Sequence, residues 1–403
     1  MVFIRITERS RDLLSANKQL HVLVIATWYP IGWDKLIGIY HKQFCEALAT
    51  AGVKVNMLHI DRQAISSLPT YPFRKKRFQI AENGYTTYIR RMLNRGRISE
   101  HLQIKAYSKC LEKLYREYEA IHGKPDVLHA QGMIPAGYAT CCLGEKIGVP
   151  VIITEHGGRF ERFFSNWAAP YAKETVEKAS KFTCVGEYMT KIYSDYCHKT
   201  ATVLPNIVDC SVFSGPKVPN TDGKLHLISV GALRPGKNFH HAVEALHILR
   251  TEGRISDFHY TIVGDGYFRD TYYASVEEHG MTDCVSFVGQ KNHEEIAQLL
   301  SKSDILLLPS EIESFGIPAV EATAAGVPVV CTRCCGPEGF LNEDCAEFSQ
   351  VGDPRSIADA IERMVQRLPD LDEAAIRRVS RQFDSAVVAQ QAISLYQDML
   401  HEV

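Results

Sequence analysis

Two cations and two carboxylates follow apolar runs in the second half of the chain, where they could bind an anionic ligand. Arg234 and Lys237 occur in SVGALRPGKN (residues 229–238), where an apolar run ends in glycine and leads into a predicted helix. Arginine binds anions through a bidentate fork, lysine through a point charge, and the first amides of a helix also attract anions. The segment predicts a phosphate or diphosphate site, with two solvated loop cations as the alternative.

The two carboxylates, Glu313 and Glu321, lie eight positions apart in SEIESFGIPAVEA (residues 310–322). DILLLPS before them is typical of a buried strand, EIESFG of a loop, and IPAVEATAAG of a helix with Pro318 in its first turn. Both acids can therefore face a crevice at the carboxyl ends of the strands. Helix capping is the alternative interpretation, because acids near a helix N-terminus stabilise the helix.

Three further segments place glycine or histidine at predicted strand ends. VIITEHGGRF puts His156 at a strand end, where it could serve a substrate hydroxyl or move a proton, or act only as a structural hydrogen bonder. Gly38 opens the first predicted helix, where bare backbone can approach a phosphate, although a plain helix start needs no ligand. Gly264 and Gly266 flank Asp265 in IVGDG, and we expect them to allow close approach of another loop or ligand.

These residues require a scaffold of parallel strands covered by helices, and short β-branched runs alternate with helical stretches almost throughout. The predicted strands are residues 21–30, 54–58, 126–130, 150–156, 181–186, 201–205, 225–231, 259–266, 285–289, 304–310 and 327–332. We predict an α/β protein with two doubly wound Rossmann-like domains facing across a crevice at the carboxyl ends of their strands.

The domain boundaries follow the composition of the chain. We predict an N-terminal extension (1–17), an N-terminal domain (18–207), a Pro- and Gly-rich linker (208–224), a C-terminal domain (225–383), and a C-terminal helix (384–403). The final helix carries one apolar stripe.

Composition excludes several classes of protein. With 45% hydrophobic and 23% charged residues and a net charge of −2, the 403-residue chain is typical of a soluble globular protein and not of a nucleic-acid binder. No signal peptide or membrane-spanning run is predicted, and twelve irregularly spaced cysteines indicate a reducing, cytoplasmic location. CTRCC (331–335) has metal-like spacing without a second pair, so we interpret its thiols as incidental.

Residues 71–97 hold eight basic side chains against one acid, Glu82, with aromatic residues interleaved. Such a stretch could dock on anionic lipid headgroups at the inner face of the membrane. A merely solvated face is the alternative.

In order along the chain, these segments resemble the retaining, nucleotide-sugar-dependent glycosyltransferases of family 4, glycosyl transferases group 1, which have the GT-B fold. Glu313 and Glu321 match the family's E-x7-E motif, GALRPGKN its phosphate loop and VGDGY its Gly-Asp-Gly segment. VLPNIVDCSVF resembles its interdomain junction, with Ile207 in place of the usual glycine, and TEHGG its strand-end histidine. The likeness runs from about His21 to the C-terminus. It implies that residues 18–207 form the acceptor-side domain and residues 225–383 the nucleotide-sugar-binding domain. It also implies that the final helix crosses back to the N-terminal domain, with Met399 and Leu400 packed there.

The resemblance implies that the cations bind the donor diphosphate, that Glu321 bonds the ribose hydroxyls, and that Glu313 holds the sugar. It implies catalytic roles for His156, Glu313, Arg234 and Lys237, and donor-binding roles for Gly38, Arg234, Lys237, Glu313, Phe315, Gly316, Ile317 and Glu321. The family's reaction retains the anomeric configuration without a metal, and the departing diphosphate accepts the acceptor's proton. No Asp-x-Asp metal motif lies beside the donor loop, so no metal and no cofactor are expected.

The predicted function is transfer of a sugar from a UDP- or GDP-sugar to a hydroxyl of a glycan, lipid-linked or small-molecule acceptor, in surface polysaccharide or glycoconjugate biosynthesis. A nucleotide-sugar epimerase or hydrolase of similar fold is the first alternative, although neither is expected to combine E-x7-E with this phosphate loop. A non-catalytic nucleotide-sugar-binding subunit is the second.

Overall fold

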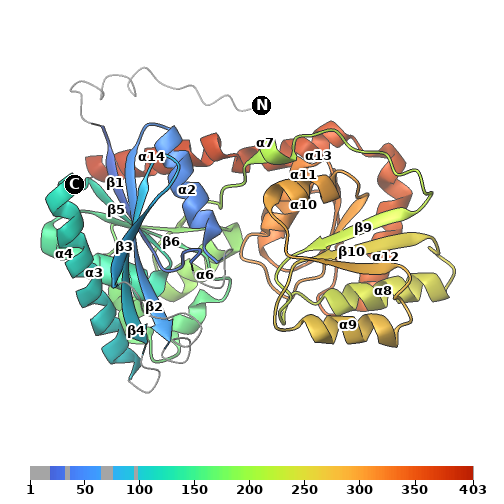
Figure 1. Cartoon of the computed structure of the whole chain (residues 1–403), viewed down its shortest axis with the longest axis horizontal. Helices are drawn as coiled ribbons and strands as arrows, with labels where there is room; N and C mark the ends of the chain where they lie inside the picture. Colours follow the sequence, from blue (N-terminus) through green and yellow to red (C-terminus); the bar gives the residue numbers. More distant parts are fainter. Residues whose placement is uncertain (1–18, 32–36, 65–75, 95–98, 403) are drawn as a thin grey trace. The chain divides into compact units, whose positions relative to one another are not determined.

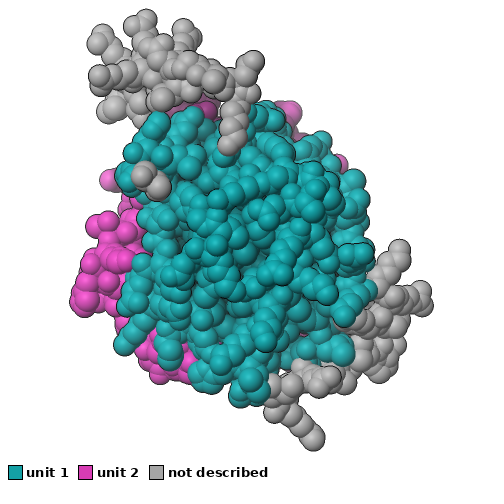
Figure 2. Space-filling view, turned by 90° about the vertical axis from the view of Figure 1, so that its left-hand side faces the viewer, with its two compact units in different colours: residues 1–153, 170–181, 393–403 teal, residues 154–169, 182–392 magenta. Residues whose placement is uncertain are grey.

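The computed structural model describes residues 19–31, 37–64, 76–94 and 99–402, so the predicted N-terminal extension (1–17) lies outside the described residues. The chain divides into two compact units, which Figure 2 colours separately. Unit 1 comprises residues 1–153, 170–181 and 393–403, and unit 2 comprises residues 154–169 and 182–392. Two sheets with flanking helices form the framework (Figure 1).

The first sheet has the order β3-β4-β2-β1-β5-β6-β7-β8 within the described residues. Its strands are β1 (His21–Ala26), β2 (Lys54–Ala64), β3 (Arg77–Ala81), β4 (Thr86–Asn94), β5 (Val127–Gln131), β6 (Val151–Glu155), β7 (Lys181–Cys184) and β8 (Thr202–Val203). The accompanying helices are α2 (Ile39–Thr50), α3 (Glu100–His122), α4 (Tyr138–Ile147), α5 (Ala169–Lys178) and α6 (Glu187–Cys197). β1 pairs in parallel with β2 and β5, so the chain leaves it in both directions, as in a doubly wound sheet.

The edge of this sheet differs from the sequence-based prediction. β3 runs antiparallel to β4 and forms a hairpin with it, in the stretch that we interpreted only as a basic surface. The side chains of β3 alternate between exposed and half-buried positions. An edge strand with a solvated face carries no continuous apolar run, which is why the sequence did not indicate it.

The second sheet has the order β11-β10-β9-β12-β13-β14, and all its recorded pairings are parallel. The strands are β9 (Leu225–Val230), β10 (Phe258–Val263), β11 (Val285–Gly289), β12 (Ile305–Leu308), β13 (Val329–Thr332) and β14 (Ala346–Ser349). The helices are α7 (Cys210–Phe213), α8 (Phe239–Thr251), α9 (Arg269–Glu278), α10 (His293–Leu300), α11 (Ile317–Ala324), α12 (Pro354–Arg367), α13 (Glu373–Ser380) and α14 (Ser385–His401). Two Rossmann-like α/β domains with parallel sheets are thereby confirmed.

Burial explains why the strands were readable from the sequence. Every residue of β1, β12 and β13 is buried, as expected for parallel strands covered on both faces. In unit 2 the core also contains apolar side chains of the helices, among them Phe239 of α8 and Ile361 of α12. Burial of this kind is the main favourable contribution to folding, at roughly 25 cal/mol per Å² of apolar surface.

The last helix, α14, contributes its first residues to unit 2 and residues 393–403 to unit 1. Within unit 1, the Tyr396 hydroxyl lies 2.6 Å from Nδ1 of His129 on β5, and both side chains are fully buried. Met399 is buried, whereas Leu400 is 36% exposed. Successive helical residues point about 100° apart, so Leu400 lies at the edge of the stripe that contains Met399.

Candidate functional site

The site residues of unit 2 cluster where the strand order of its sheet reverses. The chain passes from β9 to β10 on one side and later returns to β12 on the other side of β9, with which it pairs in parallel. Ligands of open α/β sheets bind at such a switch point, beyond the carboxyl ends of the strands. The segment with Lys237 follows β9, and the segment with Glu313 follows β12.

The loop after β9 is held by the loop after β10. The amide of Leu233 donates to the carbonyl of Asp265 at 3.0 Å, and the amide of Phe268 donates to the carbonyl of Leu233 at 3.0 Å. A Cβ added at Gly264, where φ is 138°, would lie only 1.9 Å from the carbonyl oxygen of Gly231. The prediction that this glycine allows close approach of another loop is therefore confirmed, and the close contact fixes the backbone before Lys237.

Lys237 and Glu313 form an ion pair at the switch point. Lys237 Nζ donates to Glu313 Oε1 at 2.5 Å, and the side chains are 13% and 12% exposed. The Ser310 hydroxyl donates to the same oxygen at 2.6 Å. The amide and the carbonyl of Glu313 bond the carbonyl of Cys334 and the amide of Gly336, so its backbone is fixed as well. Two segments 76 positions apart are thereby joined through their charged side chains.

The start of α11 decides between the two interpretations of the acids. Gly316 caps the helix with φ 98°, Pro318 lies in the first turn as predicted, and no side chain caps the helix. The capping alternative is therefore wrong for both glutamates. Phe315 is buried, and its ring contacts those of Phe340 and Phe383, so the residue before the cap anchors the turn in the core.

Glu321 lies within α11 and is only 3% exposed. Its Oε1 lies 3.1 Å from Nδ1 of His293, the first residue of α10. The contact with Glu321 raises the pKa of His293. A carboxylate buried to this extent needs such a partner, because desolvating an unpaired charge costs several kcal/mol.

His156 follows β6 and belongs to unit 2. Its Nδ1 lies 3.0 Å from Oδ1 of Asn206, so Nδ1 carries the proton in the neutral ring and Nε2 remains an acceptor. Burial lowers the pKa of His156 to about 3. The ring is therefore neutral near pH 7, which argues against a role as a proton shuttle and favours one as a hydrogen-bonding group. The amides of His156 and Gly157 donate to the Glu155 carboxylate at 3.0 and 2.6 Å.

Gly38 belongs to unit 1 and begins α2 as predicted. Its φ is 75°, and an added Cβ would lie 2.6 Å from the carbonyl oxygen of Trp28. Packing against Trp28 already requires glycine here, so the predicted phosphate contact of Gly38 stays a prediction. In unit 2, Arg234 is exposed on the loop before Lys237, and its carbonyl accepts from the Tyr272 hydroxyl at 2.8 Å.

The structure adds contacts that sequence reasoning missed. Arg159, which follows the predicted strand-end histidine, forms an ion pair with Glu311 of the Glu313 loop. The amide of Glu311 in turn donates to the carbonyl of Gly236 at 2.7 Å. Two of the missed residues lay in segments that the sequence analysis had quoted: Ser310 in SEIESFGIPAVEA and Asn206 in VLPNIVDCSVF. His293 had no signal except its position after a helix-capping asparagine.

The CTRCC segment (331–335) lies beside the loop that contains Glu313, since the amide of Glu313 donates to the carbonyl of Cys334. Sγ atoms of Cys331 and Cys334 are 3.8 Å apart, and both residues are fully buried. Across the part of the chain that the structure describes, no group of three or more His, Cys, Asp or Glu side chains could hold a metal ion.

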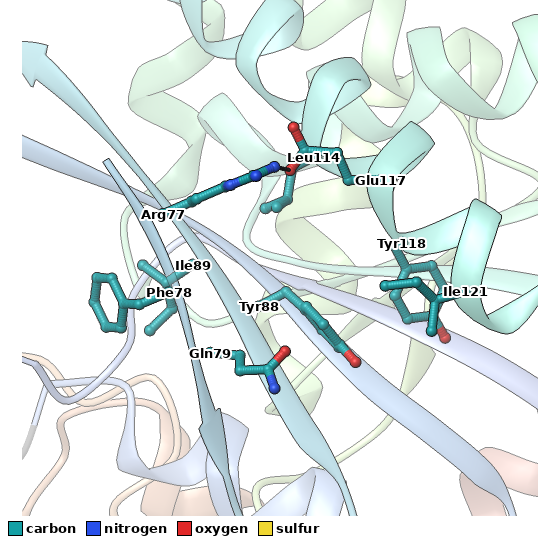
Figure 3. A pocket seen from close by; sticks show the side chains of 9 residues that line it. All are labelled: Arg77, Phe78, Gln79, Tyr88, Ile89, Leu114, Glu117, Tyr118 and Ile121. Atoms are coloured by element: carbon teal, nitrogen blue, oxygen red, sulfur yellow. Dashed lines mark ion pairs between the residues drawn. The ribbon is translucent and has the colours of Figure 1, made fainter. Parts of the chain in front are cut away.

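A hollow of about 390 Å³ lies in unit 1 between the β3–β4 hairpin and α3 (Figure 3). Its lining residues are Arg77, Phe78, Gln79, Tyr88, Ile89, Leu114, Glu117, Tyr118 and Ile121. Figure 3 shows Arg77 reaching toward Glu117, and their charged groups lie 3.1 Å apart. The residues that β4 contributes to this hollow, Tyr88 and Ile89, lie in the first half of the strand. The hollow is therefore separate from the candidate site, whose residues follow the carboxyl ends of their strands.

The basic stretch 71–97 is described only in part, since residues 71–75 and 95–97 lie outside the described residues. Of its cations, Arg77 and Arg90 pair with Glu117, and Arg91 pairs with Asp61. Docking on lipid through this stretch stays a prediction. None of the helices in the described ranges is long and apolar enough to cross a bilayer.

Comparison with known proteins assigns the class. Residues 215–379 match the family model for glycosyl transferases group 1, and residues 37–212 match that for glycosyltransferase family 4. N-acetyl-alpha-D-glucosaminyl L-malate synthase of Bacillus anthracis is 34% identical over 296 residues, which cover 69% of this chain and 76% of that protein. Glycogen synthase of Mycobacterium tuberculosis is 28% identical over 290 residues, covering 68% and 69%.

Solved structures agree with this assignment at the level of the fold. Sucrose-phosphate synthase from Thermosynechococcus elongatus superposes with a TM-score of 0.72 at 20% identity, over 96% of this chain and 100% of that one. HepE of Anabaena, solved with UDP and glucose, gives a TM-score of 0.71 at 14% identity, over 94% and 100%. The fold is that of the GT-B glycosyltransferases. The chain belongs to the glycosyl transferases group 1 family.

Proposed function

We propose that this protein is a retaining glycosyltransferase that transfers a sugar from a UDP- or GDP-sugar to a hydroxyl of a glycan or lipid-linked acceptor. The observation that carries the proposal is the contact between Lys237 and Glu313, because it joins the predicted diphosphate loop to the first acid of the E-x7-E motif. A lysine ammonium has three protons to donate. One is directed to Glu313, and the others remain for phosphate oxygens.

In this proposal the donor lies along the loops after β9 and β12. Arg234 and Lys237 neutralise the diphosphate, and Glu321 accepts hydrogen bonds from the ribose hydroxyls. Glu313 holds the sugar together with the backbone of residues 315–317. The left-handed turn at Gly316 supports this placement, because it directs the N-terminus of α11 toward the loop with Glu313, and a helix N-terminus favours negative charge.

His156 acts in the proposed reaction as a neutral hydrogen-bond acceptor. Its Nδ1 donates to Oδ1 of Asn206, which fixes the orientation of the ring, and the proposal assigns to Nε2 the role of acceptor toward a hydroxyl of the donor sugar. The burial that lowers its pKa keeps this acceptor available at neutral pH. A hydroxyl held at a fixed distance from the reacting carbon orients the sugar as the bond to the diphosphate breaks.

The proposed chemistry needs no metal at the donor site. As the bond between the sugar and the diphosphate breaks, charge develops on the leaving oxygen, and the two cations stabilise that charge. The leaving oxygen accepts the proton of the attacking hydroxyl, so the new bond forms on the face that the diphosphate leaves and the anomeric configuration is retained. A bound metal would supply the same electrostatic stabilisation.

For the acceptor and the location in the cell, we propose what the sequence analysis predicted. The proposed product belongs to surface polysaccharide or glycoconjugate biosynthesis, and the proposed location is the cytoplasm, at the inner face of the membrane when the acceptor is lipid-linked. One relative is named for L-malate and another, from Streptomyces kanamyceticus, for 2-deoxystreptamine. Small hydroxylated molecules therefore belong in the acceptor panel.

The test is a thermal-shift screen with UDP-glucose, UDP-N-acetylglucosamine, UDP-galactose and GDP-mannose. A ligand at 100 times its Kd stabilises the folded state by about 2.7 kcal/mol, so the true donor raises Tm by several degrees. Mass spectrometry with the acceptor panel then detects the product, and its anomeric coupling constant reports retention. Turnover in EDTA supports the metal-free scheme. No shift with any donor contradicts the proposal.

A further inference from the structure

His293 is the side chain in contact with the buried acid of α11. It begins α10, where the preceding residue, Asn292, caps the helix and exchanges two hydrogen bonds with Glu295. This capping box fixes the backbone from which the imidazole projects. Its Nδ1 reaches Oε1 of Glu321 at 3.1 Å, although the two residues lie 28 positions apart.

The environment of His293 favours the charged ring despite its position. A cation at a helix N-terminus is disfavoured by the helix dipole. Carboxylates nevertheless face the ring from three elements: Glu321 of α11, Glu294 of α10 itself, and Asp209 at the start of α7. Phe213 of α7 covers the ring edge-on, with ring centres 6.2 Å apart. The imidazole is therefore in contact with both an aromatic ring and the Glu321 carboxylate.

The consequence for Glu321 is geometric. A carboxylate has two oxygens that can each accept hydrogen bonds, and rotation about its last bond exchanges them. The bond from His293 to Oε1 fixes that rotation and leaves Oε2 in one place. A carboxylate fixed in this way binds a vicinal diol more tightly, because its orientation need not be ordered again when both hydroxyls donate to it.

We propose that His293 is a positioning residue, which holds the Glu321 carboxylate through Nδ1 so that it can accept hydrogen bonds from the two ribose hydroxyls of the donor. The inference rests on the proposed function, since it assigns the ribose to Glu321. His293 touches no reacting atom. It sets affinity for ribonucleotides, and its effect disappears when the ligand has no ribose hydroxyls.

The experiment compares two ligands on a set of variants by isothermal titration. The probes are UDP and 2′,3′-dideoxy-UDP, or the GDP pair if the wild-type protein binds GDP more tightly. H293A is expected to weaken binding of the ribonucleotide about tenfold, as for loss of a hydrogen bond to a charged group, and to change binding of the dideoxy analogue less than twofold. H293N places an amide N–H near the position of Nδ1 and is expected to restore most of the affinity. H293Q, whose amide lies near the position of Nε2, is not.

The matched control is H226A. His226 also contacts a carboxylate, Asp222, at 3.0 Å, but it lies in the first half of β9, away from the strand end. This variant should leave both affinities unchanged.

If H293A weakens binding of UDP and of the dideoxy analogue equally, or weakens binding of neither, the inference is overturned. The proposed function still stands in that case, because the wild-type protein binds the nucleotide. A failure of H293N to improve on H293A would overturn the role of Nδ1. Absence of nucleotide binding by the wild-type protein would overturn the proposed function and the inference together.

Discussion

The ion pair between Lys237 and Glu313 predicts an effect on stability as well as on activity. Replacing Lys237 with Met keeps an unbranched chain and removes the ammonium. The Glu313 carboxylate, 12% exposed, then retains the Ser310 hydroxyl but loses its counter-charge. Breaking one side of a buried ion pair costs about 3–5 kcal/mol when burial is complete.

Because both groups keep slight contact with solvent and Ser310 remains, we expect about 2–3 kcal/mol for K237M. A unit of this size loses about 2–4 °C in Tm per kcal/mol, so the ligand-free variant should melt roughly 4–12 °C below the wild type. The double variant K237M/E313Q removes both charges and should recover most of that loss, because neither group is left buried without a partner. Both variants should lack transfer activity.

The measurement is thermal unfolding of the ligand-free proteins, followed by the transfer assay at a temperature at which all of them are folded. An unchanged Tm for K237M would contradict the buried ion pair. Recovery of transfer by the double variant would refute the role of Lys237 on the diphosphate. The two variants therefore distinguish the effect of the ion pair on stability from its effect on activity, which a single alanine substitution cannot do.

Three other predictions concern residues outside the pair. G264A should destabilise unit 2 by more than about 3 kcal/mol, since its Cβ would overlap the Gly231 carbonyl, whereas G215A, facing open space, should melt as the wild type does. Y396F removes the hydroxyl at Nδ1 of His129 and should lower the free energy of urea unfolding by about 1–2 kcal/mol; an equal midpoint would count against it. Burial lowers the pKa of His156 to about 3, so its contribution to stability is full above about pH 6.5 and is lost as the pH falls toward 3. The urea midpoints at pH 7 and pH 4.5 should therefore differ less in H156N than in the wild-type protein.

The two sheets could be predicted because parallel strands covered on both faces are continuous apolar runs in the sequence. The β3–β4 hairpin could not, since its outer strand is solvated and rich in charge. The partners of its cations show the reason: Arg77 and Arg90 pair with Glu117 of α3, and nothing in the local sequence indicates which acid a surface arginine will meet.

The candidate site divides in the same way. The rule that ligands bind beyond the carboxyl ends of parallel strands predicted Lys237 and Glu313 for the same crevice, and the structure shows that their side chains are in contact. The partner of Glu321 was beyond that rule, because His293 lies at the start of a helix and its approach depends on how α10 packs on its neighbours. The sequence also left Glu313 between capping and ligand binding, and only the structure excludes capping, because Gly316 begins the helix and the carboxylate bonds Lys237 and Ser310.

The final helix has a consequence for how the protein is made. Unit 1 needs residues 393–403, and the buried bond between His129 and Tyr396 joins positions 267 residues apart. At about 5–20 residues per second, Tyr396 leaves the ribosome roughly 13–53 s after His129. Until that segment has been made, the first sheet must therefore keep one surface uncovered, and during this interval the surface is exposed to chaperones and proteases.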